Sequence, residues 1–268
     1  MTDVLRLIAD GDLSAALQNT QQQIRQNPAE PKLRILLFQL QCVLGRWDKA
    51  KMQLDVLRDL DTSCLLMVNT YSPVLLCEAL RKEVFAAKKT PLIFGEPPAW
   101  IALMLEALKL ENDGKYSQAE ALRDQALEQA PASSGEIDGA AFEWIADADN
   151  RLGPLLEAMV NGRYYWIPFQ QIRQVDLEKP ADLRDMVWMP AHFTWINGGE
   201  ASGFIPCRYP GSENSTDPSI QLSRRTEWQE IADGKSRGLG QRLLATNVDD
   251  YAIMDIRQIR LDPVSEEA

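Results

Sequence analysis

A short pattern that recurs three times in the first half of the chain constrains its fold more than any other feature. The pattern is glycine, any residue, a large apolar residue, two further residues and alanine, and it occupies residues 11–16, 45–50 and 114–119. Ala16 and Ala50 lie 34 residues apart, which is the period of the helix pairs in tetratricopeptide repeats. The spacing therefore predicts a helical repeat in this half.

Each copy has the residues that a turn between two packed helices requires. Apolar residues at helical spacing precede and follow each glycine, which itself allows a tight turn. The alanine lets the two backbones approach, and Pro28 and Pro131 stand where proline would end the second helix of two copies. Stacked helix pairs form a solenoid whose concave face binds peptides or helices. The alternative is that these helices only scaffold the other half.

The later parts of the chain predict a change from helices to strands. Ser72-Pro73 favours the start of a further helix, and a short helix is expected over residues 154–160, with Asn161-Gly162 ending it. Beyond this point the apolar period falls towards two, which is typical of strands. The predicted strands cover residues 171–177, 187–196, 202–209, 242–245 and 251–259, with a hairpin turn at residues 197–200.

These patterns together predict an α+β protein with two domains. Residues 1–160 form a tetratricopeptide-like α-helical repeat domain that includes a junction motif. Residues 161–268 form a small, mostly antiparallel β-rich domain. A break in composition at residues 131–135 separates the helical stretch from the irregular sequence that follows it.

Charge and cysteine content argue against several classes of function. The chain has 28 Lys and Arg against 39 Asp and Glu, a net charge of −11, which is unfavourable for binding nucleic acid. The opening lacks the basic start and apolar run of a signal peptide, and no apolar stretch approaches the roughly 18 residues of a membrane span. We therefore expect a cytoplasmic protein without a membrane contact. The cysteines, which have no CxxC spacing, are expected to be buried thiols: Cys42, Cys64, Cys77 and Cys207.

The residues give little support for catalysis. The single histidine, His192, falls in a strand pattern, and no Gly-x-Ser-x-Gly elbow supplies a nucleophile. Asp147 and Asp149, with Glu143, have the character of an acid pair or of metal ligands. Arg151 is close enough to neutralise them, which favours salt bridges that stabilise the domain junction.

A basic glycine loop at residues 238–242 is the remaining chemical candidate. Its backbone amides could cradle an anion, with Lys235 and Arg237 nearby, but the loop lacks the full phosphate-binding pattern. We therefore predict a protein that is not an enzyme and holds no cofactor or metal. The alternative is a β-domain enzyme or an anion- or nucleotide-binding protein that uses Asp147, Asp149, His192 or the loop from Gly238 to Arg242.

Tryptophan is abundant, and five of the seven tryptophans follow residue 140. Most are expected in the core, but tryptophan and tyrosine are enriched at binding hot spots, so one or two are expected to line a groove. A partner helix would place apolar anchors in that groove while acidic residues at the rim steer a basic partner. The partner-binding residues predicted at the junction are Trp144, Asp147, Asp149, Tyr165 and Trp166.

Six motifs of the second half occur in a specific order. They are the runs Phe142 to Pro154, Asn161 to Pro168, Leu183 to Ala191, Ile205 to Ser212, Arg225 to Trp228 and Gly238 to Arg242. With the helical start, they resemble the ImpE family, also called SciE-type virulence proteins or TagJ proteins, over essentially the whole chain. Ser223 departs from the family pattern, in which a glycine is expected before the two arginines.

The resemblance implies an accessory protein of the bacterial type VI secretion system that is not an enzyme. Family members are described as binding the small sheath subunit, TssB, near its N-terminal helix. They are also described as assisting the cycle in which the sheath is assembled and then disassembled by the ClpV ATPase. The resemblance assigns no binding residue to a position of this chain.

Overall fold

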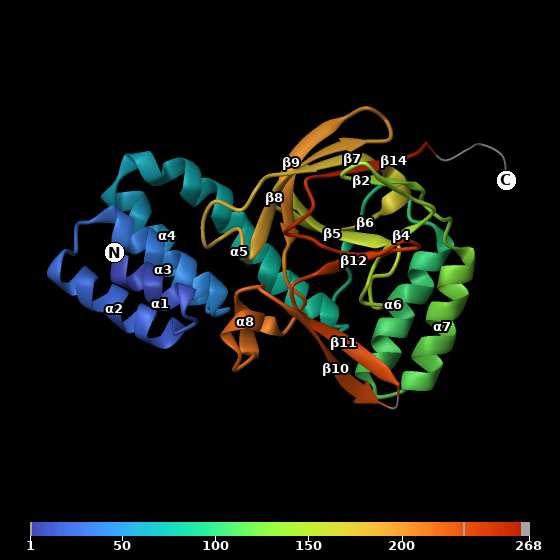
Figure 1. Cartoon of the computed structure of the whole chain (residues 1–268), viewed down its shortest axis with the longest axis horizontal. Helices are drawn as coiled ribbons and strands as arrows, with labels where there is room; N and C mark the ends of the chain where they lie inside the picture. The colour runs from blue at the N-terminus through green and yellow to red at the C-terminus, as the bar shows by residue number, and fades with distance from the viewer. Residues whose placement is uncertain (1, 233, 264–268) are drawn as a thin grey trace.

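Helices make up the first half of the protein, whose structure is a computed structural model that describes residues 2–232 and 234–263. The first four helices lie together at one end of the molecule, and α6 and α7 lie at the other end (Figure 1). The helices are α1 Thr2–Ala9, α2 Leu13–Gln26, α3 Pro31–Val43, α4 Trp47–Leu60, α5 Leu65–Phe85, α6 Ala99–Asn112 and α7 Tyr116–Gln129.

The predicted repeat is confirmed. Gly11, Gly45 and Gly114 occupy the turns that join α1 to α2, α3 to α4 and α6 to α7. Their φ angles of 82°, 62° and 77° lie in the left-handed region that glycine adopts without steric cost. The alanine of each copy is fully buried: Ala16, Ala50 and Ala119.

Helix α5 differs from the sequence-based prediction. It begins at Leu65 and continues through Pro73 to Phe85, so the helix start predicted at Ser72-Pro73 is wrong. An interior proline costs about 3 kcal/mol of helix stability, but burial of one face of this long helix outweighs that cost. Pro73 also lies against the turn at Gly162, where an added Cβ would come within 3.0 Å of the proline ring.

Among the helices of the described residues, only the stretch Thr62–Phe85, which includes α5, is long and apolar enough to cross a membrane. A core helix passes the same test of length and composition. Glu78 and Arg81 on α5 are buried and hydrogen-bonded to groups of the sheet. These contacts are typical of a helix that packs inside a folded protein.

In the part of the chain that the structure describes, nine strands form one sheet in the order β1-β6-β5-β9-β8-β7-β14-β2-β3. The pair of β1 and β6 is parallel, and the other neighbours are antiparallel. The bounds are β1 Leu92–Ile93, β2 Gly135–Ile137, β3 Ala140–Phe142, β5 Leu155–Val160, β6 Arg163–Pro168, β7 Ile172–Leu177, β8 Trp188–Trp195, β9 Glu200–Pro206 and β14 Gln258–Leu261.

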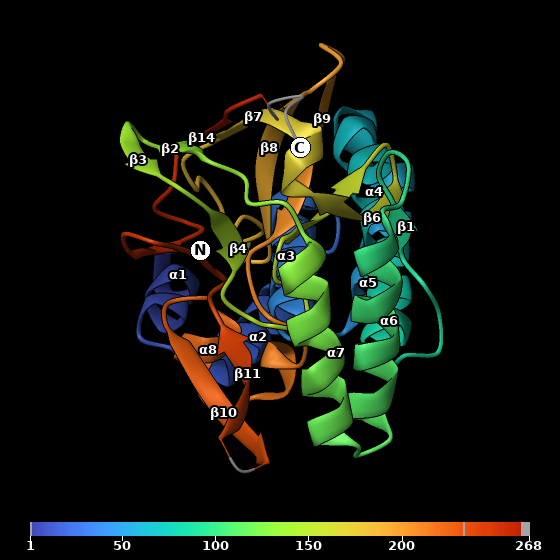
Figure 2. The ribbon, with the colours of Figure 1, turned by 90° about the vertical axis from the view of Figure 1, so that its right-hand side faces the viewer.

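Smaller elements complete the second half. Strands β4 (Ile145–Asp147), β12 (Leu243–Thr246) and β13 (Asp250–Ala252) pair with one another, and β10 (Thr226–Ala232) forms a hairpin with β11 (Lys235–Gly240). Between β9 and β10 lie the short helices η3 (Ser212–Asn214) and α8 (Pro218–Gln221). Figure 2 shows the hairpin beside the lower part of α7.

The helix predicted for residues 154–160 is wrong, because this segment forms strand β5. Asn161 and Gly162, with φ angles of 50° and 70°, make the two-residue turn of a hairpin with β6 and do not end a helix. Every residue of β5 is buried, so the period of two was masked in the sequence. Residues 251–259 likewise contain parts of two strands, β13 and β14, whereas β8 and the turn after it agree with prediction.

The sheet is covered on both faces. One core combines the helices with residues of one sheet face, such as Leu155 and Trp188, and the other lies between the opposite face and the small sheet. Strands β2, β4 and β5 precede residue 161 and still pair with strands that follow it. The helical repeat therefore shares a core with the sheet, and the domain division at residue 160 stays a prediction.

Alanine substitutions at two turn glycines separate backbone strain from steric overlap. Gly114 has open space around it, so Gly114→Ala should lower the free energy of unfolding by about 1 to 2 kcal/mol through the left-handed backbone alone. A Cβ at Gly45 would lie 2.4 Å from Cγ of Glu213, so Gly45→Ala should lower it by about 1 to 3 kcal/mol more. Urea titrations of both variants measure this. Equal losses would contradict the contact between the turn and η3.

Candidate functional site

A buried group of charges joins the helices to the sheet. Glu157 of β5 is paired with Arg81 of α5 and with Arg242, which precedes β12. Its carboxylate also accepts a hydrogen bond of 2.6 Å from Tyr164, whose own oxygen accepts one of 2.8 Å from Trp166 Nε1. These five side chains are buried. The cluster therefore joins residues of α5, of strands β5 and β6, and of the segment before β12, which are far apart in the sequence.

The two carboxylates beside Arg242 have opposite pKa shifts. Burial alone would raise the pKa of Glu157, but the guanidinium groups of Arg81 and Arg242 outweigh burial and hold that pKa below its ordinary value. At Asp147, which also pairs with Arg242, burial prevails and raises the pKa from 3.8 to about 6. The cluster therefore holds one firmly ionised carboxylate and one that titrates under mildly acidic conditions.

The predicted salt bridge of the junction motif is confirmed. Asp149 accepts two hydrogen bonds from the Arg151 guanidinium, at 2.9 and 2.6 Å. Asp149 also accepts a bond of 2.9 Å from the backbone amide of Gly238. The amide of Gly240 donates to Ser212 Oγ at 2.8 Å. The loop predicted at residues 238–242 is wrong in part, because Gly238 and Gly240 lie in strand β11. Both glycine amides already have partners within the protein, which gives no support to an anion site there.

Two arginines of the second half reach the carboxyl ends of the repeat helices. Arg208 donates to the carbonyl oxygens of Val43 at 2.7 Å and Cys42 at 2.9 Å, where α3 ends. Arg224 does the same for Ile8 and Ala9 at the end of α1. Cations are favourable at these negative helix ends. The segment between β9 and β10 is therefore anchored on the repeat.

The departure at Ser223 has a local structural account. Its φ angle of 54° is left-handed, the conformation in which glycine is most at ease. The serine hydroxyl donates a hydrogen bond of 2.6 Å to the carbonyl oxygen of Met186. This bond accompanies the unusual backbone conformation that places Arg224 on α1.

The predicted partner-binding residues do not form one surface. Asp147 and Asp149 are buried in the ion pairs described above, and Trp166 is fully buried against Phe85, with ring centroids 5.7 Å apart. The structure covers Asp147 and Trp166 with other parts of the protein, whereas Asp149, although buried, lines the pocket described below. The assignment of these residues to a partner stays a prediction. Trp144 is 40% exposed, and Tyr165 packs partly buried against Phe94.

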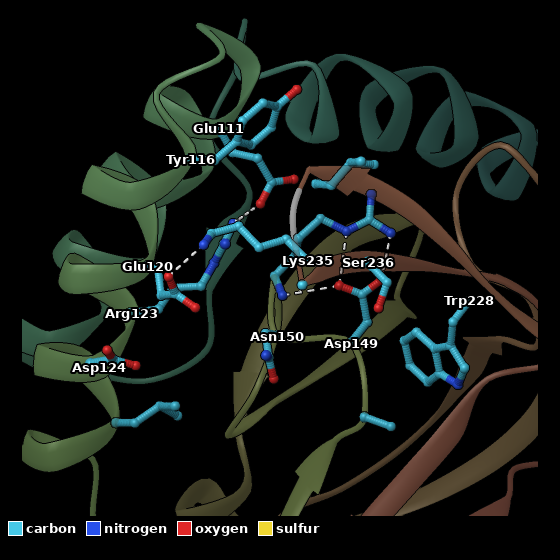
Figure 3. Close-up of a pocket in the computed structure, with 15 residues that line it drawn as sticks. Glu111, Tyr116, Glu120, Arg123, Asp124, Asp149, Asn150, Trp228, Lys235 and Ser236 are labelled. Atoms are coloured by element: carbon cyan, nitrogen blue, oxygen red, sulfur yellow. Dashed lines mark hydrogen bonds and ion pairs between the residues drawn. The ribbon is translucent and has the colours of Figure 1, made fainter.

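A surface pocket of about 410 Å³ lies between α6, α7, the loop that carries Asp149, and the β10–β11 hairpin (Figure 3). We call it the junction pocket. Its lining residues are Glu111, Tyr116, Glu120, Arg123, Asp124, Leu127, Ala148, Asp149, Asn150, Arg151, Trp228, Ile231, Gly234, Lys235 and Ser236.

The junction pocket combines paired charges with an exposed apolar rim. Glu111 of α6 is paired with Arg123 of α7, and Lys235 of the hairpin lies 2.6 Å from a carboxylate oxygen of Glu120. Leu127 and Trp228 line the pocket while 44% and 42% exposed, respectively. Such a pocket suits an apolar anchor flanked by polar groups, which is the composition of a protein-binding site.

Trp228 and Leu127 are not among the site residues predicted from the sequence. Trp228 lies in the family motif Arg225 to Trp228, so the motif singled it out without indicating its exposure. The neighbouring strand residues from Glu227 to Glu230 are also exposed. A mostly polar strand that carries one tryptophan is the signal that could have indicated a surface role.

The chemical candidates of the β-rich part show no catalytic arrangement. His192 is exposed on β8, and its two ring nitrogens lie 3.5 Å from Ser202 Oγ and 3.6 Å from a Glu200 oxygen. Burial raises the pKa of the Cys77 and Cys207 thiols to about 12, and all four cysteines are buried and unbridged, as predicted. Within the described residues, no three His, Cys, Asp or Glu side chains are grouped as metal ligands.

Comparison with known proteins agrees with these features. A tetratricopeptide-repeat model matches residues 7–64, and the ImpE protein model matches residues 139–260. Over 257 residues, the chain is 46% identical to the type VI secretion system accessory component TagJ of Pseudomonas aeruginosa. The aligned region covers 96% of this chain and 90% of that protein. The chain belongs to the ImpE family.

The ImpE fold is also present in a crystal structure. Protein VPA1032 from Vibrio parahaemolyticus superposes with a TM-score of 0.88 over 97% of both chains, at 23% sequence identity. The region matched by the ImpE model contains the acceptor Glu157, its partner Arg242 and the pocket residue Trp228. The buried charges other than Arg81, and one wall of the junction pocket, therefore belong to the ImpE region.

Removal of Glu157 should show how much the ImpE fold depends on its buried charges. Glu157→Ala leaves two buried arginines without this partner and should lower the free energy of unfolding by about 3 to 5 kcal/mol. Glu136→Ala removes a more exposed ion pair with Arg260 and should cost less than about 1 kcal/mol. Urea unfolding compares the two. If Glu157→Ala does not fold, Glu157→Gln provides the measurement, and a loss no larger than that of Glu136→Ala would contradict the prediction.

Asp147 should make stability depend on pH in an unusual direction. Its folded pKa of about 6 lies above the ordinary 3.8, so its contribution is present at low pH and is lost as pH rises through about 6. Asp147→Asn does not titrate there. The free energy of unfolding of the natural protein minus that of the variant should therefore fall by up to about 3 kcal/mol from pH 4 to pH 7. Urea titrations at both pH values measure it, and a difference that stays constant or rises would contradict the assignment.

Proposed function

We propose that this protein is a non-enzymatic accessory component of the bacterial type VI secretion system that acts by binding another protein. The similarity to the accessory component TagJ over 96% of the chain carries the proposal. The helical repeat and the apolar rim of the junction pocket are both features of protein-binding domains. Asp147 and Asp149, the acidic pair considered for catalysis, are engaged in internal ion pairs.

The partner that we propose is the small sheath subunit, a TssB-like protein, bound through its N-terminal helix. This choice follows from the family resemblance. Binding would assist sheath assembly or the recycling that is linked to the ClpV ATPase, which the protein would meet only indirectly. The proposal includes a cytoplasmic location and involves neither nucleic acid nor membrane.

The junction pocket is the surface that we assign to this partner. Trp228 from the hairpin and Leu127 from α7 provide apolar contacts for the buried face of an amphipathic helix. Asp124 also lines the pocket, and the net charge of −11 favours the approach of a basic segment. Helix-in-groove binding at this site explains why an aromatic side chain is left exposed in a pocket whose other charges are mostly paired within the protein.

Two tryptophans of similar exposure provide a matched test of this site. Titration calorimetry with the N-terminal helical peptide of the cognate small sheath subunit should show saturable one-to-one binding. Trp228→Ala should weaken that binding by about 30-fold or more, as expected for loss of a hot-spot anchor worth about 2 kcal/mol. Trp144→Ala, which removes a 40% exposed tryptophan outside the pocket, should leave the affinity unchanged.

Two other outcomes would show whether the proposed location of the site or the proposed partner is wrong. Binding that is lost in Trp144→Ala and kept in Trp228→Ala would place the partner at the β3–β4 turn instead of the pocket. The absence of heat and of competition with the natural protein would refute the proposed contact with the sheath subunit. Circular dichroism and urea midpoints of both variants check that each one is folded.

A further inference from the structure

A second surface pocket, of about 660 Å³, lies on the helical repeat and shares no lining residue with the junction pocket. We call it the α4–α5 pocket. One wall is the turn and first residues of α4, from Gly45 to Lys49, and the other is the stretch of α5 from Leu76 to Glu83. That stretch is about 10 Å long, which matches about two turns of a bound helix.

The floor of the α4–α5 pocket is apolar and held in place. Leu76 is 66% exposed and lines the pocket together with Leu80 and Trp47. The Trp47 ring lies 5.8 Å from that of buried Trp188, so the sheet supports it from behind. Leu76, Leu80 and Trp47 line the same pocket, so Leu76 belongs to a contiguous apolar patch, which is a feature of an interaction site more than of a solvated helix face.

The charges around this pocket are opposite in sign to those of the protein as a whole. Four cations line it against two carboxylates, Asp48 and Glu83, although the chain carries a net charge of −11. Among the described residues, none of these cations lies within 4.0 Å of a carboxylate oxygen: Arg46, Lys49, Lys82 and Lys89. By contrast, Lys51 on the same helix pairs with Asp55 at 3.0 Å.

The sheet covers much of the inner face of the helical repeat, so a partner is expected to bind an outer surface such as the α4–α5 pocket. Most of α3 is buried. Tyr71 of α5 packs against Trp188 and Phe204 of the sheet, with ring centroids 5.9 and 5.3 Å apart. The protein's own sheet therefore occupies the surface on which a peptide would bind to an open repeat, and the α4–α5 pocket lies outside that contact.

We propose that the α4–α5 pocket binds an acidic amphipathic helix of a partner protein. Leucine-type side chains one turn apart on that helix would contact Leu76, Leu80 and Trp47, and its Glu or Asp residues would pair with Lys49, Lys82 and their neighbours. The start of α4 adds to this preference, because Arg46 at its N-cap makes no side-chain hydrogen bond to the first amides. The proposal goes beyond the proposed function, since it adds a second site with the opposite charge preference.

A pair of synthetic peptides tests the charge preference. The probe is a fluorescein-labelled helical peptide of about 14 residues with Leu at i, i+3, i+4 and i+7, Ala between them and Glu on its outer face. Fluorescence anisotropy at low salt should show saturable binding to the full chain, weakened by added salt. In the Trp228→Ala variant, whose junction pocket should no longer bind a basic helix, the same peptide with Lys in place of Glu should bind at least 10-fold more weakly than the acidic peptide. Equal affinities, or no saturation by the acidic peptide up to millimolar protein, would overturn the proposal.

Two leucines of α5 provide the matched variants. Leu76→Glu should reduce affinity for the acidic peptide at least 10-fold. Leu66→Glu alters a leucine that is 80% exposed on the same helix but outside the pocket, and it should leave the affinity unchanged. Lys49→Glu combined with Lys82→Glu should reverse the preference between the two peptides. Equal effects of Leu76→Glu and Leu66→Glu would show that binding is nonspecific and overturn the proposal.

The same variants keep this result separate from that of the junction pocket. Leu76→Glu should leave the affinity for the sheath-subunit peptide unchanged, and Trp228→Ala should leave the affinity for the acidic peptide unchanged. Light scattering of the natural protein and of Leu76→Glu tests a further occupant. An oligomer that the Leu76→Glu change dissociates would mean that a second copy fills the pocket, which would also overturn the proposal.

Discussion

The buried carboxylate of Glu157 is the interaction on which the arrangement of helices and sheet depends. It lies on the sheet face that packs against the helices, and it is paired with Arg81 of α5 and with Arg242 from the far end of the chain. Desolvation of such charges costs several kcal/mol for each ion, so the pairs add little net stability compared with an apolar core. Their consequence is geometric, because any displacement of α5 leaves a buried charge without its partner.

Other contacts between the repeat and the second half follow the same principle of satisfied buried polar groups. Arg208 and Arg224 donate to carbonyl oxygens in the last turns of α3 and α1, where partners within the helix run out. Those of Cys42 and Ile8 also accept from the amides of Gly45 and Gly11. Aromatic rings of the sheet pack against Tyr71 of α5 and Trp47 of α4. The sheet of the same protein therefore covers much of the inner face of the repeat. In an open repeat array, that inner face is free to bind peptides.

Recognition is consequently assigned to two surfaces at the margins of this contact. The junction pocket is formed where the β10–β11 hairpin meets α7, and most of its charges are already paired within the protein. The α4–α5 pocket keeps its cations unpaired among the described residues. An accessory protein with both sites has separate contacts for a basic and an acidic segment, so it is suited to holding two partners, or two parts of one assembly, together.

The sequence by itself determined the features that depend on neighbours along the chain. Gly11, Gly45 and Gly114 indicated the helical turns because a left-handed backbone is a local property, and the spacing of Asp149 and Arg151 indicated their ion pair. The tertiary structure alone decided which side chains are covered. Residues 155–160 form a strand with both faces buried, and Trp166 is enclosed while Trp228 is exposed. Burial depends on residues far apart in sequence, and neither composition nor periodicity records which of them meet.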